Sequence, residues 1–90
     1  MYKVLESNTA QKDKKKIKSM NKAIKQRFID IFNLLQNNPY SYEFSGEDLK
    51  YDLVDYRSFE LTKKDRVVFQ ILESDCIVKV FQYLGHYKDK

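Results

Sequence analysis

The chain has few of the residues that build disulfides, metal sites and flexible turns. It has one cysteine (Cys76), one histidine (His86), two glycines and one proline among 90 residues. A lone cysteine excludes an internal disulfide. One cysteine with one histidine also argues against a closed zinc site, which takes about four Cys or His ligands. So little glycine and proline excludes a collagen-like or low-complexity chain.

Long apolar runs are also missing. No stretch approaches the roughly 18 apolar residues that span a membrane, and the N-terminus lacks an apolar leader with a cleavage site. We therefore expect no membrane partner and a reducing compartment, with the cytoplasm as the default. Hydrophobic residues make up 42% of the chain and aromatics 14%. That is enough for a packed core, and the length fits one domain over residues 1–90.

The charge is unevenly distributed. Residues 11–27 carry eight Lys or Arg against Asp13 alone, whereas residues 28–61 are net acidic. A dense basic segment indicates a polyanion or an acidic protein partner, and nucleic acid is the commonest cellular polyanion. A solvated helical face explains the same charges equally well.

Two helices follow a short N-terminal strand in the expected order. Residues 2–6 are typical of a strand, and Ser7, Asn8 and Thr9 are good N-cap residues for a helix over 9–18. Residues 21–37 form the clearest element, because apolar residues recur every three or four positions. Asn21 can cap this helix, and Pro39 ends it. Its apolar stripe consists of Met20, Ala23, Ile24, Phe28, Ile31 and Leu35.

The second half alternates with the period of two that is typical of strands. Residues 40–55 are read as a loop region with one short strand at most, followed by strands over 57–61, 66–72 and 76–84. In the last strand, alternation places Tyr83 on the same face as Ile77, Lys79 and Phe81. Three sequential strands form an antiparallel meander. The predicted fold is α+β, a small β-α-α-β-β-β domain with a helical hairpin packed on a mainly antiparallel sheet.

Three residues could carry chemistry, each with an ordinary alternative. His86 titrates near neutrality and suits acid–base work, although a lone histidine is more often structural. Arg66 opens a strand on the face away from Val67 and could clamp a phosphate or form a surface ion pair. Glu47 and Lys50 could line a site or belong to a solvated loop. No phosphate-cradling glycine loop or other nucleotide-binding motif is present.

The order and spacing of these residues resemble the RelE/ParE toxin superfamily, most closely its YoeB/Txe branch. The segments that carry the resemblance are Glu47-x-Leu49-Lys50, Tyr56-Arg57-Ser58, Asp65-Arg66-Val67-Val68-Phe69 and Tyr83-x-Gly85-His86-Tyr87. The resemblance implies the toxin of a type II toxin–antitoxin system. It implies a ribosome-dependent endoribonuclease that cleaves mRNA in the A site without metal or cofactor. Its partners would be a cognate antitoxin, the ribosome and mRNA, and related toxins can form homodimers.

The resemblance also implies a role for each matching residue. Glu47 matches the general base, Arg66 the group that stabilises the transition-state charge, His86 the general acid, and Tyr87 a residue that positions the scissile phosphate. Such a set can assist attack of a 2′-hydroxyl on the adjacent phosphate. The residues expected to contact RNA are Lys50, Arg57, Lys14, Lys15, Lys18 and Lys22.

One pair of residues departs from the branch. Its members usually carry two arginines just before the turn between the first two meander strands, and here the residues are Phe59 and Glu60. Arg57 shares a strand face with Phe59 and is expected to stand in for one of them. The departure leaves an alternative open, in which the chain is a non-catalytic toxin such as a ParE-like gyrase inhibitor, or a degenerate homologue that only binds.

Overall fold

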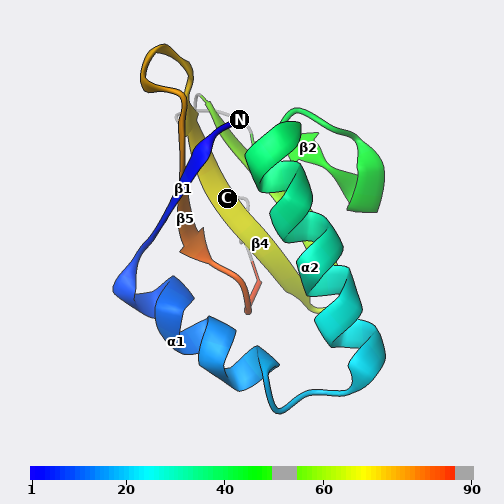
Figure 1. Ribbon diagram of the computed structural model, residues 1–90. Coiled ribbons are helices and arrows are strands. Elements are labelled where there is room, and N and C mark those ends of the chain that lie inside the picture. The colour runs from blue at the N-terminus through cyan, green and yellow to red at the C-terminus, as the bar shows by residue number, and fades with distance from the viewer. Residues whose placement is uncertain (50–54, 87–90) are drawn as a thin grey trace.

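A computed structural model describes residues 1–49 and 55–86. The elements follow one another as in Figure 1, and single 3-10 turns interrupt the chain at Glu43–Ser45 (η1) and Glu73–Asp75 (η2). The helices and strands are β1 (Lys3–Glu6), α1 (Asn8–Ile17), α2 (Lys22–Asn37), β2 (Glu47–Asp48), β3 (Tyr56–Thr62), β4 (Asp65–Leu72) and β5 (Ile77–Gln82).

The strands form one sheet in the order β1-β5-β4-β3-β2. β3, β4 and β5 make the predicted antiparallel meander, and β2 adds two residues to the outer side of β3. β1 pairs in parallel with β5. The predicted α+β class and the mainly antiparallel sheet are therefore confirmed.

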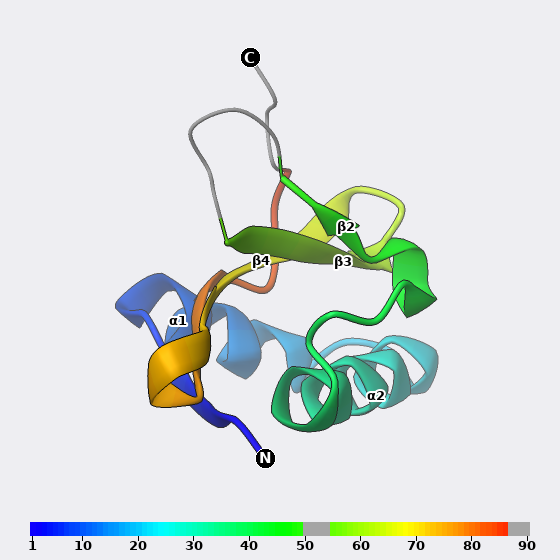
Figure 2. The same cartoon turned by 90° about the horizontal axis from the view of Figure 1, so that it is seen from above.

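Both helices lie on the same side of the sheet (Figure 2). Each begins at a side-chain cap, because Ser7 Oγ accepts the N–H of Ala10 and Asn21 Oδ1 accepts the N–H of Ile24. α1 starts one residue before the predicted helix, since Ser7 is the capping residue. α2 ends at Asn37, as proline two residues later requires. No helix among the described residues is long and apolar enough to cross a membrane.

The core fills the space between the sheet and the helices. Ile31 and Leu35 of α2 are fully buried there, as the apolar stripe predicts, whereas Ala23 of that stripe is exposed. The sheet contributes Phe59, Leu61, Val67, Phe69, Ile71, Val78 and Val80, and Tyr83 joins them from just beyond β5.

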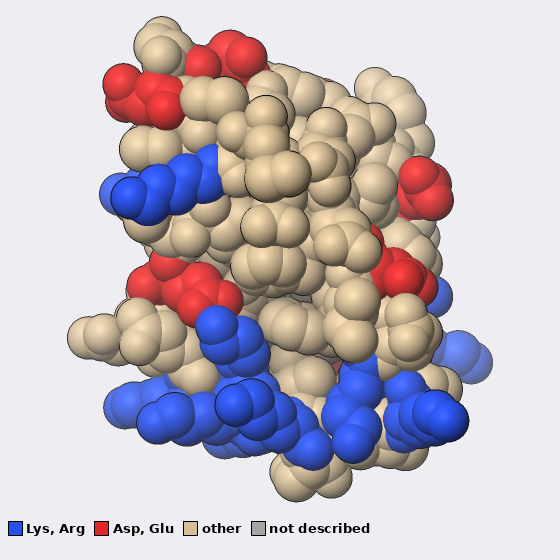
Figure 3. All heavy atoms as spheres, in the orientation of Figure 1, with Lys and Arg blue, Asp and Glu red and all other residues tan. Residues whose placement is uncertain are grey.

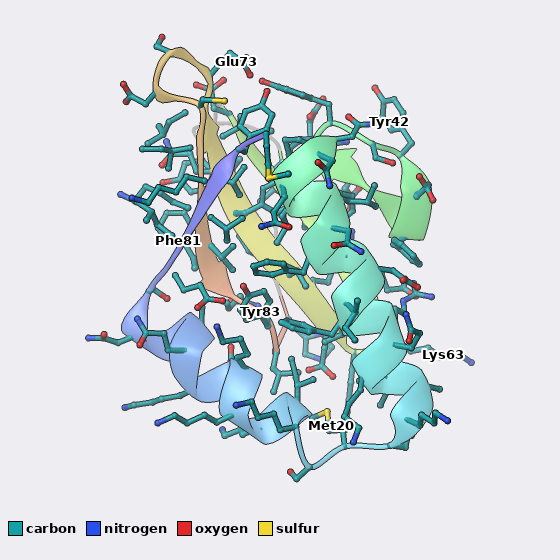
Figure 4. All side chains as sticks on the ribbon, in the orientation of Figure 1. Met20, Tyr42, Lys63, Glu73, Phe81 and Tyr83 are labelled. Atoms are coloured by element: carbon teal, nitrogen blue, oxygen red, sulfur yellow. The ribbon has the colours of Figure 1, made fainter. Side chains whose placement is uncertain are left out.

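The predicted face of Tyr83 is wrong. β4 pairs Phe69 with Val80 but Val68 with Gln82, so Phe81 forms a bulge that has no partner. A bulge reverses the alternation beyond it, and Tyr83 turns into the core instead of following Phe81 (Figure 4). β5 also starts later than predicted, at Ile77.

Candidate functional site

Arg66 lies at the centre of the candidate site, on the face of the sheet opposite the helices. Its Nε donates a hydrogen bond to Ser58 Oγ at 3.0 Å, and its Nη2 donates one to the Ser45 carbonyl oxygen at 2.9 Å. The same Nη2 lies 3.3 Å from the Glu47 carboxylate. The structure therefore brings together two of the residues that the sequence singled out, Glu47 and Arg66.

The short strand β2 carries Glu47 to this place. Glu47 pairs with Ser58 of β3, directly beside the hydroxyl that Arg66 contacts. The preceding residue must be glycine, because a Cβ on Gly46 would lie 2.2 Å from the Ser41 carbonyl oxygen and 2.9 Å from the Phe59 ring. The tight approach of the loop to β3 thus depends on Gly46.

Two carboxylates hold the backbone that leads from β5 to His86. Asp13 of α1 is buried, and its Oδ2 accepts the N–H groups of Tyr83 at 3.0 Å and Leu84 at 3.1 Å. Asp65 at the start of β4 accepts the N–H of Gly85 through Oδ1 at 2.8 Å. Three consecutive donors are thereby fixed, by side chains from two different elements.

His86 follows this anchored segment and lies near the start of β4. The N–H of Arg66 donates to the Gly85 carbonyl oxygen at 2.8 Å, so the backbone of Arg66 contacts the residue next to the histidine. Burial by itself raises the pKa of Asp65. The hydrogen bonds from Thr62 and Gly85, together with nearby positive charge that includes His86, outweigh this effect and lower that pKa. His86 is exposed.

Glu60 faces the same site. It pairs with Arg66 across β3 and β4, and its Oε1 lies 3.9 Å from Arg66 Nη1. Its Oε2 lies 3.9 Å from Nη2 of Arg27, which comes from α2. Arg27 also donates from Nε to the Glu60 carbonyl oxygen at 2.9 Å and stacks on the Phe44 ring. A residue of the helix layer therefore reaches round β3 to the candidate site.

Arg57 lies beside Phe59, on the strand face that the alternation gives it, but its side chain is buried there. Its side chain is 3% exposed, and it points to the helix side of the sheet. Its Nε donates to Asp48 Oδ1 at 2.8 Å, and its Nη1 donates to the carbonyl oxygens of Pro39 and Ser41. A guanidinium enclosed in this way is not available to RNA, so the expectation that Arg57 replaces a phosphate-binding arginine does not fit. Tyr87 and Lys50, which the resemblance also assigns to the site, lie outside the described residues.

The basic segment forms one surface over α1 and the start of α2 (Figure 3). Lys15, Lys18 and Lys22 are exposed there, while Lys14 is half-buried and forms an ion pair with Glu6 at 2.7 Å. A hollow of about 220 Å³ lies between the two helices. Its lining consists of Lys14, Ile17, Lys18, Lys25, Phe28 and Ile29. Two of the four predicted lysines, Lys14 and Lys18, therefore line the same hollow.

A metal has no evident place at this site. Among residues 1–49 and 55–86, no three His, Cys, Asp or Glu side chains gather in a way that could hold a metal ion. The groups that the site does offer are one arginine, the carboxylates around it and a nearby histidine.

No protein-family model matches the sequence, and no curated protein matches it. Solved structures do match in shape. The YoeB/ParE toxin from Agrobacterium tumefaciens has a TM-score of 0.82 and 21% identity, over 94% of this chain and 99% of that one. The YoeB-YefM toxin–antitoxin complex from Staphylococcus aureus has a TM-score of 0.77 and 19% identity, over 97% of this chain and 99% of that one. The chain has the RelE/YoeB fold.

An archaeal relative shares this fold too. The RelE-RelB complex from Pyrococcus horikoshii has a TM-score of 0.72 and 21% identity, and 97% of each chain is covered. The RelE/YoeB fold is therefore shared although only about one aligned residue in five is identical.

Sequence reasoning missed the roles of three residues that shape the site: Asp13, Arg27, and Asp65, which it named only within a segment that carries the resemblance. Asp13 left a signal, since it is the one acidic residue of a basic segment and lies at helical spacing from the buried Ala10 and Ile17. An acid on the apolar stripe of a helix is buried only with partners. Arg27 gave no comparable signal, because its role depends on how closely α2 approaches β3.

Proposed function

We propose that the chain is the toxin of a type II toxin–antitoxin pair and an endoribonuclease that cleaves mRNA on the ribosome. The observation that carries the proposal is the contact of Glu47 with Arg66, beside the anchored segment that ends in His86. The backbone N–H of Arg66 bonds to the residue before His86, which supports a site where a base, a cation and an acid act together. An ordinary surface ion pair does not require the backbone beside a histidine to be anchored at three successive N–H groups.

The chemistry follows from these groups. Glu47 takes the proton of the 2′-hydroxyl as its oxygen attacks the adjacent phosphorus, and Arg66 stabilises the charge that develops on the phosphate. His86 donates a proton to the departing 5′ oxygen, which leaves a 2′,3′-cyclic phosphate and a 5′-hydroxyl end. The Glu47 side chain is 60% exposed and has no hydrogen bond to Arg66, so it is free to move to the substrate. Tyr87 positions the phosphate, as the resemblance implies.

The partners follow from the surfaces. Lys15, Lys18 and Lys22 supply sequence-independent contacts to ribosomal RNA phosphates, with Lys14 and Lys50 as further contacts. The YoeB and RelE chains of the matching structures are bound to the antitoxins YefM and RelB. By analogy, an antitoxin neutralises this chain in the cytoplasm. A YoeB dimer from S. aureus supports, by the same analogy, a homodimer of this chain.

The test is a cell-free translation reaction programmed with one defined mRNA. New RNA 5′ ends are mapped by primer extension after addition of the protein, with and without ribosomes. We expect cuts that require ribosomes. His86→Ala and Arg66→Ala should each reduce cutting by at least about 100-fold, as loss of an acid or of charge stabilisation typically does.

Ser74→Ala is the matched control, because Ser74 is exposed in η2 and, among the described residues, has no hydrogen bond to Glu47, Arg66 or His86. It should cut as the unaltered protein does. Equal cutting by the His86→Ala and Arg66→Ala variants, with all proteins folded, would contradict the assignment.

A second candidate is a non-catalytic toxin that inhibits by binding alone. The position of Glu60 favours it, since this carboxylate places a second negative charge near Arg66 and weakens its attraction for phosphate. Arrested translation without RNA cuts would support this candidate. Supercoiling by gyrase that stops on addition of the protein would identify the target as gyrase.

A further inference from the structure

The carboxylate of Glu60 lies between two guanidinium groups from different layers of the fold. One oxygen faces Arg66 Nη1 and the other faces Arg27 Nη2, each at 3.9 Å. These are ion pairs without hydrogen bonds, because N–H···O hydrogen bonds to charged groups are about 2.7–3.2 Å long. Glu60 is therefore attracted by both arginines but held tightly by neither.

Both arginines are fixed by other contacts. Arg66 uses Nε and Nη2 on Ser58 and Ser45, and Arg27 uses Nε on the Glu60 carbonyl oxygen while its guanidinium stacks 4.7 Å from the centre of the Phe44 ring. The nitrogen atoms that face the Glu60 carboxylate are the ones that none of these hydrogen bonds uses. If that carboxylate turns away, two oriented guanidinium edges remain.

We infer that Arg27 and Arg66 together bind one phosphodiester group of the RNA, in the place that the Glu60 carboxylate takes in the structure. A phosphodiester resembles a carboxylate in presenting two oxygen atoms that share one negative charge, and guanidinium groups bind either with paired N–H donors. Glu60 then acts as an internal competitor that the RNA displaces. This inference rests on the proposed function, because it assigns a ligand to the Arg66 site.

The displacement costs little. The Glu60 side chain is 35% exposed, so its carboxylate remains hydrated when it moves, and exposed ion pairs contribute little net stability. The phosphate takes over both ion pairs of the carboxylate and adds direct hydrogen bonds to the two guanidinium groups. The toxins that this chain resembles usually carry an arginine where it has Glu60. Arg27 supplies that positive charge from α2 instead.

The test measures binding without cleavage. The probe is a fluorescently labelled single-stranded oligonucleotide with 2′-deoxy sugars, which has the phosphates of RNA but no attacking hydroxyl. Its affinity is measured by fluorescence anisotropy at several salt concentrations. The variants are Glu60→Gln, Arg27→Gln, the double variant, and the controls Glu43→Gln and Lys63→Gln.

Glu60→Gln should bind about three- to tenfold more tightly than the unaltered protein. Glu43→Gln removes one negative charge from exposed η1 and should improve binding by less than twofold. Arg27→Gln should weaken binding about three- to tenfold and should reduce the slope of log affinity against log salt by about 0.7, the value for one single-strand phosphate contact. Lys63→Gln removes an exposed charge from the β3–β4 turn. It should change the affinity and the salt slope less than Arg27→Gln does.

The double variant separates competition from general charge. If Glu60 blocks the position between the arginines, Arg27→Gln should cost more in the Glu60→Gln background than alone. Additive effects, or a Glu60→Gln gain no larger than that of Glu43→Gln, would overturn the inference. A gain in affinity also cannot come from misfolding, whereas Arg27→Lys tests whether a lost contact with Phe44 explains the Arg27→Gln result.

The outcomes are distinct from those of the cleavage test. Binding that follows this pattern without any RNA cuts would overturn the ribonuclease and leave the phosphate position intact. RNA cuts with no effect of Glu60→Gln or Arg27→Gln on binding would support the ribonuclease and overturn the phosphate position. Failure of every variant to bind the oligonucleotide would overturn the inference whatever the cleavage result.

Discussion

Asp13 and Asp65 hold three successive N–H groups of the segment that carries His86. Asp13 reaches from α1 to Tyr83 and Leu84, and Asp65 reaches from β4 to Gly85. Neither aspartate is expected to touch substrate. They act as positioning residues, because the place of His86 relative to Arg66 depends on both.

Removal of the Asp13 carboxylate should destabilise the fold. Asp13→Ala leaves two N–H groups without their acceptor, and we expect a loss of about 2–4 kcal/mol in the free energy of unfolding. Urea denaturation measures it. Lys12→Ala on the exposed side of α1 is the matched control and should change stability by less than about 0.5 kcal/mol. Equal losses in the two variants would show that the Asp13 contacts add nothing.

Asp65 should make stability depend on pH below neutrality. The hydrogen bonds from Thr62 and Gly85 hold its pKa in the folded protein below the ordinary aspartate value. Its contribution to stability is therefore complete above the pKa of the unfolded chain and is lost as the pH falls through the folded value. The unaltered protein should therefore exceed Asp65→Asn in unfolding free energy by a constant amount at pH 5–7. Below about pH 4 the difference should shrink. Urea unfolding over this range measures it, and a difference that grows on acidification would contradict the sign.

Tyr2 and Tyr40 should ionise late in an alkaline titration. Both hydroxyls donate to Glu73 Oε1, at 2.6 Å and 2.8 Å, and the hydrogen bond to Glu73 is the main cause that raises the pKa of Tyr2 to about 12. The pKa of Tyr40 is raised for the same reason. Tyrosinate absorbance against pH measures both. Glu73→Gln should move these ionisations toward pH 10, whereas Asp75→Asn in the same turn should leave them in place.

Replacement of Arg57 should affect stability and β2 more than RNA binding. Arg57→Ala leaves the carbonyl oxygens of Pro39 and Ser41 without their donor, which should cost about 2–4 kcal/mol. β2 also loses the ion pair between its Asp48 and Arg57 of β3, so Glu47 should shift and cleavage should fall. The salt dependence of oligonucleotide binding should not change. A reduced slope would instead show that Arg57 contacts phosphate, as the sequence alone suggests.

Local signals predict the elements of this chain well. Caps at Ser7 and Asn21, the stop at Pro39 and the alternation of β3 and β4 depend on neighbours within a few residues. The face of Tyr83 cannot be predicted in this way. The unpaired Phe81 reverses the alternation of faces beyond it, and no residue type in the sequence predicts a bulge there. The resemblance assigns Glu47 and Arg66 to one site, whereas their contact depends on the approach of β2 to β3.

The burial of Arg57 shows a second limit. An arginine on an alternating strand is ordinarily exposed, and here two backbone carbonyls from residues 39 and 41 enclose it. Those carbonyls are 16 to 18 residues away, in a segment without periodicity. Glu60 and Arg27 are likewise 33 residues apart. Contacts of this length are fixed by packing and cannot be read from spacing.

The pairing of the first strand with the last has a consequence for synthesis. β1 finds its partner only in β5, since Lys3 pairs with Ile77. A growing chain that has not reached β5 also lacks the backbone donors that Asp13 binds. The candidate site can therefore assemble only after nearly the whole domain has been translated.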